Sequence, residues 1–190
     1  MRIALFGGSF DPPHRGHVAI IEAAFRALPI DRLYIAPTYL NPFKNSARFP
    51  ASLRLKWMRD IARDSRDSEC IEVTDFEIAK GAPTPTIQTV RFLKERGKIE
   101  HFYLLLGSDQ LPRLHEWHSF AELKKLVEFV IIRRDEAEIA RSFRTLELSE
   151  RISSSEIRTE LDKGELSGAL KEAIPACIRD EVLAQNPISI

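Results

Sequence analysis

The chain has 190 residues, and its 28 lysine and arginine residues balance 28 aspartate and glutamate residues, so the formal net charge is zero. A chain of this length buries a core without disulfide staples, and a neutral charge argues against a general nucleic-acid binder, which is usually basic. No apolar run approaches the roughly 20 residues of a membrane span. Cys70 and Cys177 match no metal-ligand spacing, so we expect two free thiols in a cytoplasmic protein, with a disulfide as the alternative.

The first half of the chain alternates apolar runs with helical patterns. Residues 3–6 predict a buried strand that ends at two glycines, and residues 16–28 carry apolar side chains at the three- and four-residue spacing of a helix. A strand is then expected over 32–36, a long loop over 38–50, a helix over 51–63 and a strand over 70–74. A loop of this length in a compact domain is often functional.

The second half continues the alternation. A polar segment leads to a helix over 86–96, which Thr84 or Thr86 can cap. Two further strands are expected, over 101–106 and 127–132, with a short helix over 120–126 between them. A helix then opens at Ser153, and a last one covers 166–184 with a break at Pro175.

This alternation predicts a Rossmann-like α/β fold, a doubly wound parallel sheet with helices on both faces. We expect one domain over 1–190, with a C-terminal helical part at about 150–185. Ligands of such sheets bind beyond the carboxyl ends of the strands. The residues that follow each strand are therefore the candidates for chemistry.

The first of these candidates is the loop GGSFDPPHRGH, residues 7–17. Its glycines allow close backbone approaches, and the helix that opens at its end offers free N–H groups to a phosphate oxygen. His14 and His17 lie three residues apart, which places both imidazoles near that helix N-terminus. The alternative is a tight turn with two surface histidines. The dinucleotide fingerprint G-x-G-x-x-G and the Walker P-loop are both absent.

The second candidate is ISSSEIR, residues 152–158. Ser153 and Glu156 have the spacing of a capping box, which predicts a helix start. Serine hydroxyls and free amides at that start, with Arg158 one turn on, make a second phosphate cradle. A plain capping box without a ligand is the alternative.

Together the two segments resemble the G-x-F-D-P-x-H-x-G-H and I-S-S-T-x-x-R signatures of the nucleotidyltransferase superfamily, with Ser155 in place of the usual threonine. Residues 84–89, 107–109 with Trp117, and 130–134 are similar to its nicotinate-nucleotide adenylyltransferase branch. The resemblance covers essentially residues 1–185. The chain departs from the branch at Phe43, where histidine is usual, at Asp135, where proline is usual, and in a tail without Gly-x-Tyr.

The resemblance implies adenylyl transfer from ATP to nicotinate mononucleotide, which gives deamido-NAD and pyrophosphate in NAD biosynthesis. It implies Mg²⁺ bound with ATP, largely through water, and no metal site made by the protein alone. We expect His14, His17 and Arg158 to be catalytic. The expected ATP-binding residues are Gly7, Gly8, Ser9, Phe10, His14, His17, Gly107, Asp109, Ile152, Ser153, Ser154 and Arg158. Lys44, Thr86, Trp117 and Arg133 are expected to bind the substrates, with Trp117 stacking on the pyridine ring.

Several of these residues have a structural alternative. Trp117 is also compatible with a core position, and Thr86 and Asp109 with helix caps. Arg133 belongs to a group of arginines, with Arg134, Arg141 and Arg144, that is also compatible with a solvated face. We expect His115 and His118 at the surface and a structural role for His101.

Three other functions stay open. The first is another member of the superfamily, such as a pantetheine-phosphate adenylyltransferase or a cytidylyltransferase. The second is a nucleotide sensor without catalysis, and the third is a fragment of a class I aminoacyl-tRNA synthetase. The sequence also leaves open the choice between nicotinate and nicotinamide mononucleotide, and whether the chain forms a homo-oligomer.

Overall fold

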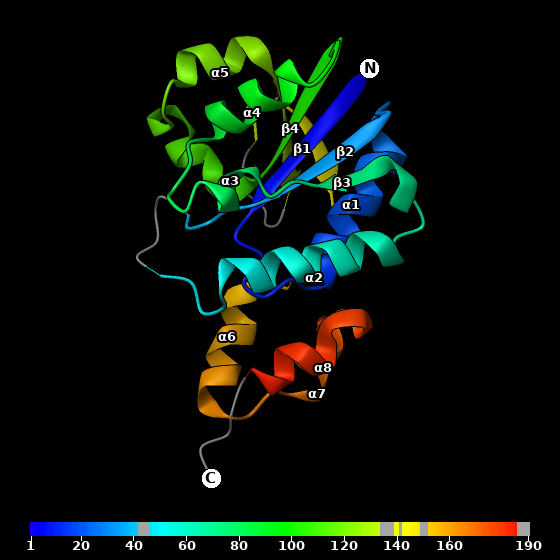
Figure 1. The fold of residues 1–190 in the computed structure, drawn as a ribbon, viewed down its shortest axis with the longest axis vertical. Helices are drawn as coiled ribbons and strands as arrows, with labels where there is room; N and C mark the ends of the chain where they lie inside the picture. Colours follow the sequence, from blue (N-terminus) through cyan, green and yellow to red (C-terminus); the bar gives the residue numbers. More distant parts are fainter. Residues whose placement is uncertain (42–45, 134–138, 141, 149–151, 186–190) are drawn as a thin grey trace.

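The computed structural model describes residues 1–41, 46–133, 139–140, 142–148 and 152–185. Its sheet has six strands, all parallel, in the order β3-β2-β1-β4-β5-β6 (Figure 1). The strands are β1 (Arg2–Gly8), β2 (Arg32–Pro37), β3 (Ile71–Val73), β4 (His101–Gly107), β5 (Glu128–Arg133) and β6 (Arg144–Glu147). The predicted doubly wound parallel sheet is confirmed, and its order reverses between β1 and β4, where such sheets bind ligands.

Helices cover both faces of this sheet (Figure 1). The α-helices are α1 (Arg15–Ala27), α2 (Ala51–Asp64), α3 (Phe76–Ala79), α4 (Thr86–Glu95), α5 (Phe120–Leu126), α6 (Ser154–Lys163), α7 (Gly168–Ala173) and α8 (Ala176–Ala184). Two 3₁₀ helices, η1 (Ser68–Cys70) and η2 (Ser108–Glu116), complete the described elements. No helix among the described residues combines the length and apolar character that a membrane crossing needs.

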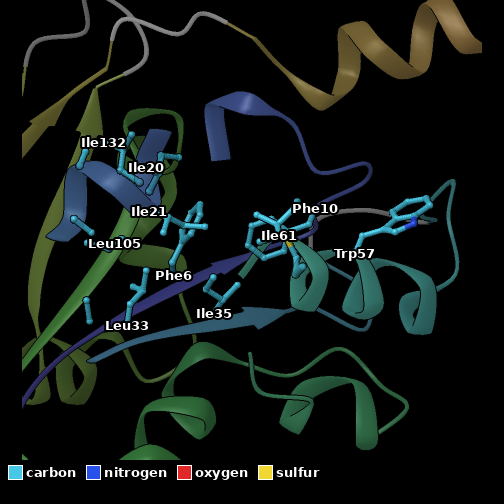
Figure 2. Close-up of a cluster of buried hydrophobic side chains, with 14 of the residues drawn as sticks. Phe6, Phe10, Ile20, Ile21, Leu33, Ile35, Trp57, Ile61, Leu105 and Ile132 are labelled. Carbon is cyan, nitrogen blue, oxygen red and sulfur yellow. The ribbon is translucent and has the colours of Figure 1, made fainter. Parts of the chain in front are cut away.

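The alternating side chains of the central strand divide the core into two layers. In β1, Ala4 and Phe6 join a cluster with α1, α2 and the C-terminal helices, whereas Ile3 and Leu5 join a cluster with α4 and α5. Figure 2 shows the part of the first cluster in which Phe6 lies among side chains of α1 and α2. All four β1 side chains are almost fully buried, and burying a large apolar side chain contributes about 1.5–3 kcal/mol. Both faces therefore hold the central strands in place, and the ends of these strands are a rigid platform.

The C-terminal helices belong to the first of these layers. Ile157 of α6 and Ile178 and Val182 of α8 are buried in the cluster that contains Phe6. The indole Nε1 of Trp57 in α2 also donates a hydrogen bond to Glu181 Oε2 at 2.9 Å. The C-terminal helices therefore share a core with the sheet, which supports the prediction of one domain over 1–190.

The structure departs from the expected elements at a few places. The edge strand β6 was not expected, because Leu146 is its only buried side chain and a four-residue segment carries little pattern. The short helices α3 and η2 were also missed. The expected threonine cap of α4 is wrong, since Pro85 is its N-cap and Thr84 Oγ1 instead donates to the Ala82 carbonyl at 3.1 Å. The C-terminal helical stretch does break at Pro175, and both cysteines are free thiols, which excludes the disulfide.

Candidate active site

A cavity of about 580 Å³ lies at the carboxyl ends of β1 and β4, at the switch point of the sheet. It is lined by both strand ends, by the loop after β1, and by the starts of α4 and α6. Most of the predicted site residues line it together: Gly7, Gly8, Ser9, Phe10, His14, His17, Thr86, Gly107, Asp109, Trp117, Ser153, Ser154 and Arg158. Segments as far apart in the sequence as Gly7 and Arg158 thus meet in one place.

The loop after β1 folds tightly because the glycines that flank it, Gly8 at the end of β1 and Gly16 at the start of α1, let aromatic rings approach the backbone. A Cβ on Gly8 would lie 3.0 Å from the ring of Phe10, and a Cβ on Gly16 would lie 3.0 Å from the ring of His14. Phe10 itself has a positive φ of 50°, which a non-glycine residue rarely adopts. Its ring is almost fully buried and packs edge-on against Phe6, with 5.3 Å between centroids. We infer that this packing holds the loop in its strained conformation.

The two histidines lie side by side at the start of α1. Their ring centroids are 3.8 Å apart, and only 2% of His14 and 6% of His17 is exposed. The backbone N–H of His14 donates to Nδ1 of His17 at 3.1 Å. Since this nitrogen accepts a hydrogen bond, a neutral His17 carries its proton on Nε2. The expected placement of both imidazoles at one helix N-terminus is confirmed, and the alternative of two surface histidines is excluded.

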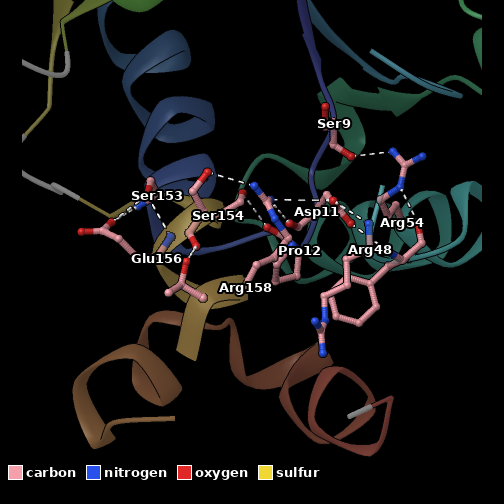
Figure 3. A network of polar contacts seen from close by, with 12 residues as sticks. Ser9, Asp11, Pro12, Arg48, Arg54, Ser153, Ser154, Glu156 and Arg158 are labelled. Carbon is pink, nitrogen blue, oxygen red and sulfur yellow. Dashed lines mark hydrogen bonds and ion pairs between the residues drawn. The ribbon is translucent and has the colours of Figure 1, made fainter. Parts of the chain in front are cut away.

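Two buried charged residues, Asp11 and Arg54, hold neighbouring loops together through hydrogen bonds to the backbone (Figure 3). Asp11 accepts the backbone N–H groups of Arg48 at 3.0 Å and of Phe49 at 2.9 Å. Arg54 in α2 is 1% exposed and donates to the carbonyls of Ser9, Thr38, Tyr39 and Phe49 at 2.5–3.0 Å. Burial lowers the pKa of Arg54, and the nearby Asp11 opposes that shift. Arg54 therefore ties both ends of the loop between β2 and α2 to the loop after β1.

Sequence reasoning missed this role of both residues. Asp11 stands inside the first motif, so its position was a usable signal. Arg54 lies within an ordinary amphipathic helix, and its partners are backbone carbonyls, which carry no residue-specific signal in the sequence.

The start of α6 lies against the same loop (Figure 3). Ser153 Oγ accepts the N–H of Glu156 at 3.2 Å, and Glu156 Oε2 accepts the N–H of Ser153 at 2.8 Å, which confirms the capping box. Ser154 Oγ donates to the Pro12 carbonyl at 3.0 Å. Arg158 donates to the Asp11 carbonyl at 2.6 Å and lies 3.7 Å from its carboxylate. The two motifs thus form one surface, and the start of α6 is more than an isolated cap.

The opposite end of the cavity is built from α3, the start of α4 and the end of η2. Thr86 is the first residue of α4, and no side chain caps that helix, so its first N–H groups are available to an anion. The buried Nε1 of Trp117 has no hydrogen-bond partner in the described part of the chain. Asp109 lies in the first turn of η2 and accepts a hydrogen bond from Gln110 at 2.6 Å.

A glutamate at this end was also missed by sequence reasoning. Glu77 of α3 lines the cavity although only 5% of it is exposed, and Thr89 Oγ1 donates to its Oε1 at 2.7 Å. Burial raises its pKa to about 7, against the opposing effects of Thr89 and Lys80. Its segment looks polar and carries no helical period, so nothing in the sequence indicated a buried carboxyl.

Some predicted residues do not line the cavity. Ile152 packs partly buried against the core, and Arg133 forms an ion pair with Glu147 at 2.9 Å. Lys44 lies outside the described residues, as do Phe43, Arg134, Asp135 and Arg141. Arg144 donates to Glu128 at 3.0 Å on the exposed edge of the sheet. His115 and His118 are exposed as expected, although His118 also lines the cavity. His101 Nε2 lies 2.7 Å from Glu128 Oε2, in keeping with a structural role.

The polar groups at the motif end suit an anion more than a bare cation. Imidazoles, serine hydroxyls, a guanidinium and helix N-termini face the cavity there. Within the described ranges, no three His, Cys, Asp or Glu side chains gather as a metal site would require. The arrangement is able to hold a polyphosphate and to stabilise charge that grows on it.

Comparison with known proteins agrees with this chemistry. The profile of the cytidylyltransferase-like family matches residues 5–160. A probable nicotinate-nucleotide adenylyltransferase of Nitratiruptor sp. is 43% identical over 92% of this chain and 97% of its own length. A protein of the same name from Sulfurimonas denitrificans is 46% identical over 86% and 87%.

Solved structures show the same fold. The nicotinic acid mononucleotide adenylyltransferase of Plasmodium falciparum, complexed with NaAD, superposes with a TM-score of 0.81 at 24% identity, over 98% of this chain and 96% of that one. A putative nicotinate-nucleotide adenylyltransferase of Vibrio parahaemolyticus superposes with a TM-score of 0.69 at 17% identity, over 96% and 99%.

Proposed function

This chain belongs to the cytidylyltransferase-like family and, within it, to the nicotinate-nucleotide adenylyltransferases, and from that premise we propose that it transfers an adenylyl group from ATP to nicotinate mononucleotide. The products are deamido-NAD and pyrophosphate, in a step of NAD biosynthesis. The observation that carries the proposal is the meeting of two helix N-termini, those of α1 and α6, at one cavity with Arg158 between them.

The reaction itself asks little acid–base chemistry of the protein. A 5′-phosphate oxygen of the mononucleotide attacks the α-phosphorus of ATP, and the bond from that phosphorus to the β-phosphate oxygen breaks. The attacking oxygen is already an anion, so no general base is needed. The protein has to align two polyanions and to stabilise the charge that develops on the phosphates.

The paired histidines fit the second of these tasks. A neutral His17 carries its proton on Nε2, because its Nδ1 accepts the His14 N–H. Both rings are buried beside the positive end of α1, where a donated hydrogen bond is stronger than in water. We assign to His14 and His17 the donation of hydrogen bonds to the ATP phosphates in the transition state.

The start of α6 fits the leaving group. Ser153, Ser154 and Arg158 line the cavity there, and the anchoring of Arg158 on Asp11 and Ser155 fixes the direction of its guanidinium. These groups would hold the β- and γ-phosphates. The residues that would lie around Mg²⁺ carried by ATP at this end offer imidazole, hydroxyl and guanidinium groups, so the oxygen ligands of the metal would come from the phosphates and from water. When bound, the metal neutralises phosphate charge.

The other end of the cavity fits the pyridine. The uncapped start of α4 at Thr86 would receive the nicotinate carboxylate, and Trp117 would stack on the ring. Asp109, which was predicted among the ATP-binding residues, lines the cavity beyond the end of β4 and would accept hydrogen bonds from a ribose hydroxyl. The cavity of about 580 Å³ lies within the range of small-molecule sites.

A pyrophosphate-release assay with ATP and Mg²⁺ tests the proposal. We expect release with nicotinate mononucleotide and none with phosphopantetheine or with CTP substrates. Release only with one of the latter would assign the chain to another activity of the superfamily. ATP binding without any turnover would indicate a nucleotide sensor. We further propose that the enzyme acts in the cytoplasm, which its two free thiols support.

A further inference from the structure

A buried carboxyl lies at the pyridine end of the cavity, and the mechanism above does not use it. Glu77 of α3 lines the cavity together with Thr84 and Thr86, and only 5% of it is exposed. Thr89, in the first turn of α4, donates to Oε1 at 2.7 Å. The other oxygen, Oε2, is buried and has no hydrogen-bond partner among the described residues. A buried acceptor without a partner is costly, which points to a role beyond packing.

The groups around Glu77 leave its pKa near neutral pH. Lys80, directly after α3, and the hydroxyl of Thr89 in α4 both lower the pKa of Glu77. The strand β2, on which α3 packs, contributes the phenol of Tyr34 to the same side of the sheet. Asp109, Glu116 and His118 line the rest of this end of the cavity. Burial outweighs the opposing groups and raises the pKa of Glu77 to about 7.

Glu77 and the substrate would share one helix N-terminus. The carboxyl of Glu77 accepts a hydrogen bond from Thr89, three residues after Thr86, and it lines the same cavity as Thr86. The proposed function places the nicotinate carboxylate at the free N–H groups beside Thr86. Two negative charges at one buried site oppose each other. A protonated Glu77 removes that repulsion. Nicotinamide mononucleotide carries a neutral carboxamide at the same ring position, so an ionised Glu77 does not repel it.

We propose that Glu77 is a specificity-determining residue of the pyridine site, which favours nicotinate when it holds a proton and relaxes the preference toward nicotinamide when it is ionised. The proposal rests on the proposed function, because it concerns the choice between two mononucleotides in that reaction. It makes the substrate preference a property that cytoplasmic pH sets.

The test compares kcat/KM for nicotinate and nicotinamide mononucleotide between pH 5.5 and 8.5. Both substrates carry the same 5′-phosphate and react with the same ATP, so the titration of phosphates and of the active-site histidines cancels in the ratio. We expect the ratio to fall by about tenfold as the pH rises through 7, because an ionised Glu77 opposes a second negative charge in the same cavity, and a tenfold change corresponds to an interaction of about 1.4 kcal/mol.

Two variants sharpen the comparison. Glu77→Gln keeps the shape and the acceptor for Thr89 but cannot ionise, so its ratio should stay level across the same range. Lys80→Met changes an exposed side chain that lines no part of the cavity. Lys80 lowers the pKa of Glu77, so its removal should move the fall in the ratio to higher pH.

The outcomes separate this inference from the proposed function. If neither mononucleotide is turned over at any pH, the proposed function is wrong and the inference falls with it. If both react but the wild-type ratio stays level, or if Glu77→Gln keeps the wild-type slope, only the inference is wrong. Should Glu77→Gln fail to fold, the wild type and Lys80→Met decide the question.

Discussion

The two ends of the cavity are built in different ways. At the phosphate end, the loop after β1 and the start of α6 bond directly to each other, through Ser154 to Pro12 and Arg158 to Asp11. At the pyridine end, three separate segments meet, and Trp117 Nε1 and Glu77 Oε2 both lack a hydrogen-bond partner among the described residues.

This difference matches two different tasks. A developing charge on phosphorus is stabilised best by donors that are already fixed, since no energy is then spent on reorganisation in the transition state. A pyridine ring has to be chosen among similar rings, and polar atoms that only the right ligand satisfies provide that choice. We therefore expect changes at the phosphate end to act mainly on kcat, and changes at the pyridine end on KM and substrate preference.

The largest expected effect is that of His17→Ala. It removes a fixed donor that acts in the transition state, so we expect kcat to fall by roughly 10²–10³-fold. The KM for nicotinate mononucleotide should change little, because the pyridine end is untouched. Steady-state kinetics with each substrate varied in turn measures both quantities.

His115→Ala is the matched control, because His115 is exposed and does not line the cavity. It should leave kcat unchanged. If kcat for His17→Ala falls by less than about threefold, His17 is not a hydrogen-bond donor to the transition state, because the loss of such a donor lowers kcat far more. The proposed difference in task between the two ends would then be wrong.

The sequence predicted the phosphate end well and the pyridine end incompletely. His14 and His17 belong to one continuous motif, and Ser153 and Glu156 form a capping box whose local geometry follows from spacing alone. Glu77 lies in a helix of only four residues, too short for a period to reveal which face is buried.

The same distinction holds for the fold. Strands with continuous apolar runs, such as β4, were predicted within a residue or two. The edge strand β6 was not, because its place depends on pairing with β5 and not on its own composition. Arg54 shows the limit of motif reasoning, since its four acceptors are backbone carbonyls that any residue type provides.

A second prediction concerns the pH dependence of the free energy of unfolding, which the buried Glu77 at the pyridine end should affect. Burial raises the pKa of Glu77 from 4.5 to about 7, so the unfolded chain loses this proton at lower pH than the folded chain does. The free energy of unfolding should therefore fall as the pH rises between these values, by about 3 kcal/mol in total. Glu77→Gln should remove this loss and be more stable, relative to the wild type, at pH 8 than at pH 5.

Urea unfolding at the two pH values measures the difference. Glu95→Gln serves as the control, because Glu95 is exposed at the end of α4. If the free energy of unfolding has the same pH dependence in Glu77→Gln and Glu95→Gln, burial does not raise the pKa of Glu77 in the folded chain.

A third prediction tests the ring pocket. Trp117→Ala should raise the KM for nicotinate mononucleotide by about tenfold, as the loss of an aromatic stacking partner implies, and leave the KM for ATP within twofold. Trp117→Phe should recover part of the loss, since it restores a ring. An equal rise in both KM values would mean that Trp117 supports the whole cavity through packing, which its contacts with the core also allow.

The smallest expected effect lies back at the phosphate end. Arg158 donates to Ser155 Oγ at 2.9 Å, at the position where the superfamily signature has threonine. Ser155→Ala removes that one hydrogen bond, worth about 0.5–1.5 kcal/mol, while the contact of Arg158 with Asp11 remains. We expect the KM for ATP to rise by about threefold, whereas Ser155→Thr keeps the hydroxyl and should behave like the wild type. A rise for Ser155→Ala as large as that for Arg158→Ala would mean that Asp11 alone cannot orient the guanidinium. The phosphate end would then depend on a single hydroxyl and would be no more firmly fixed than the pyridine end.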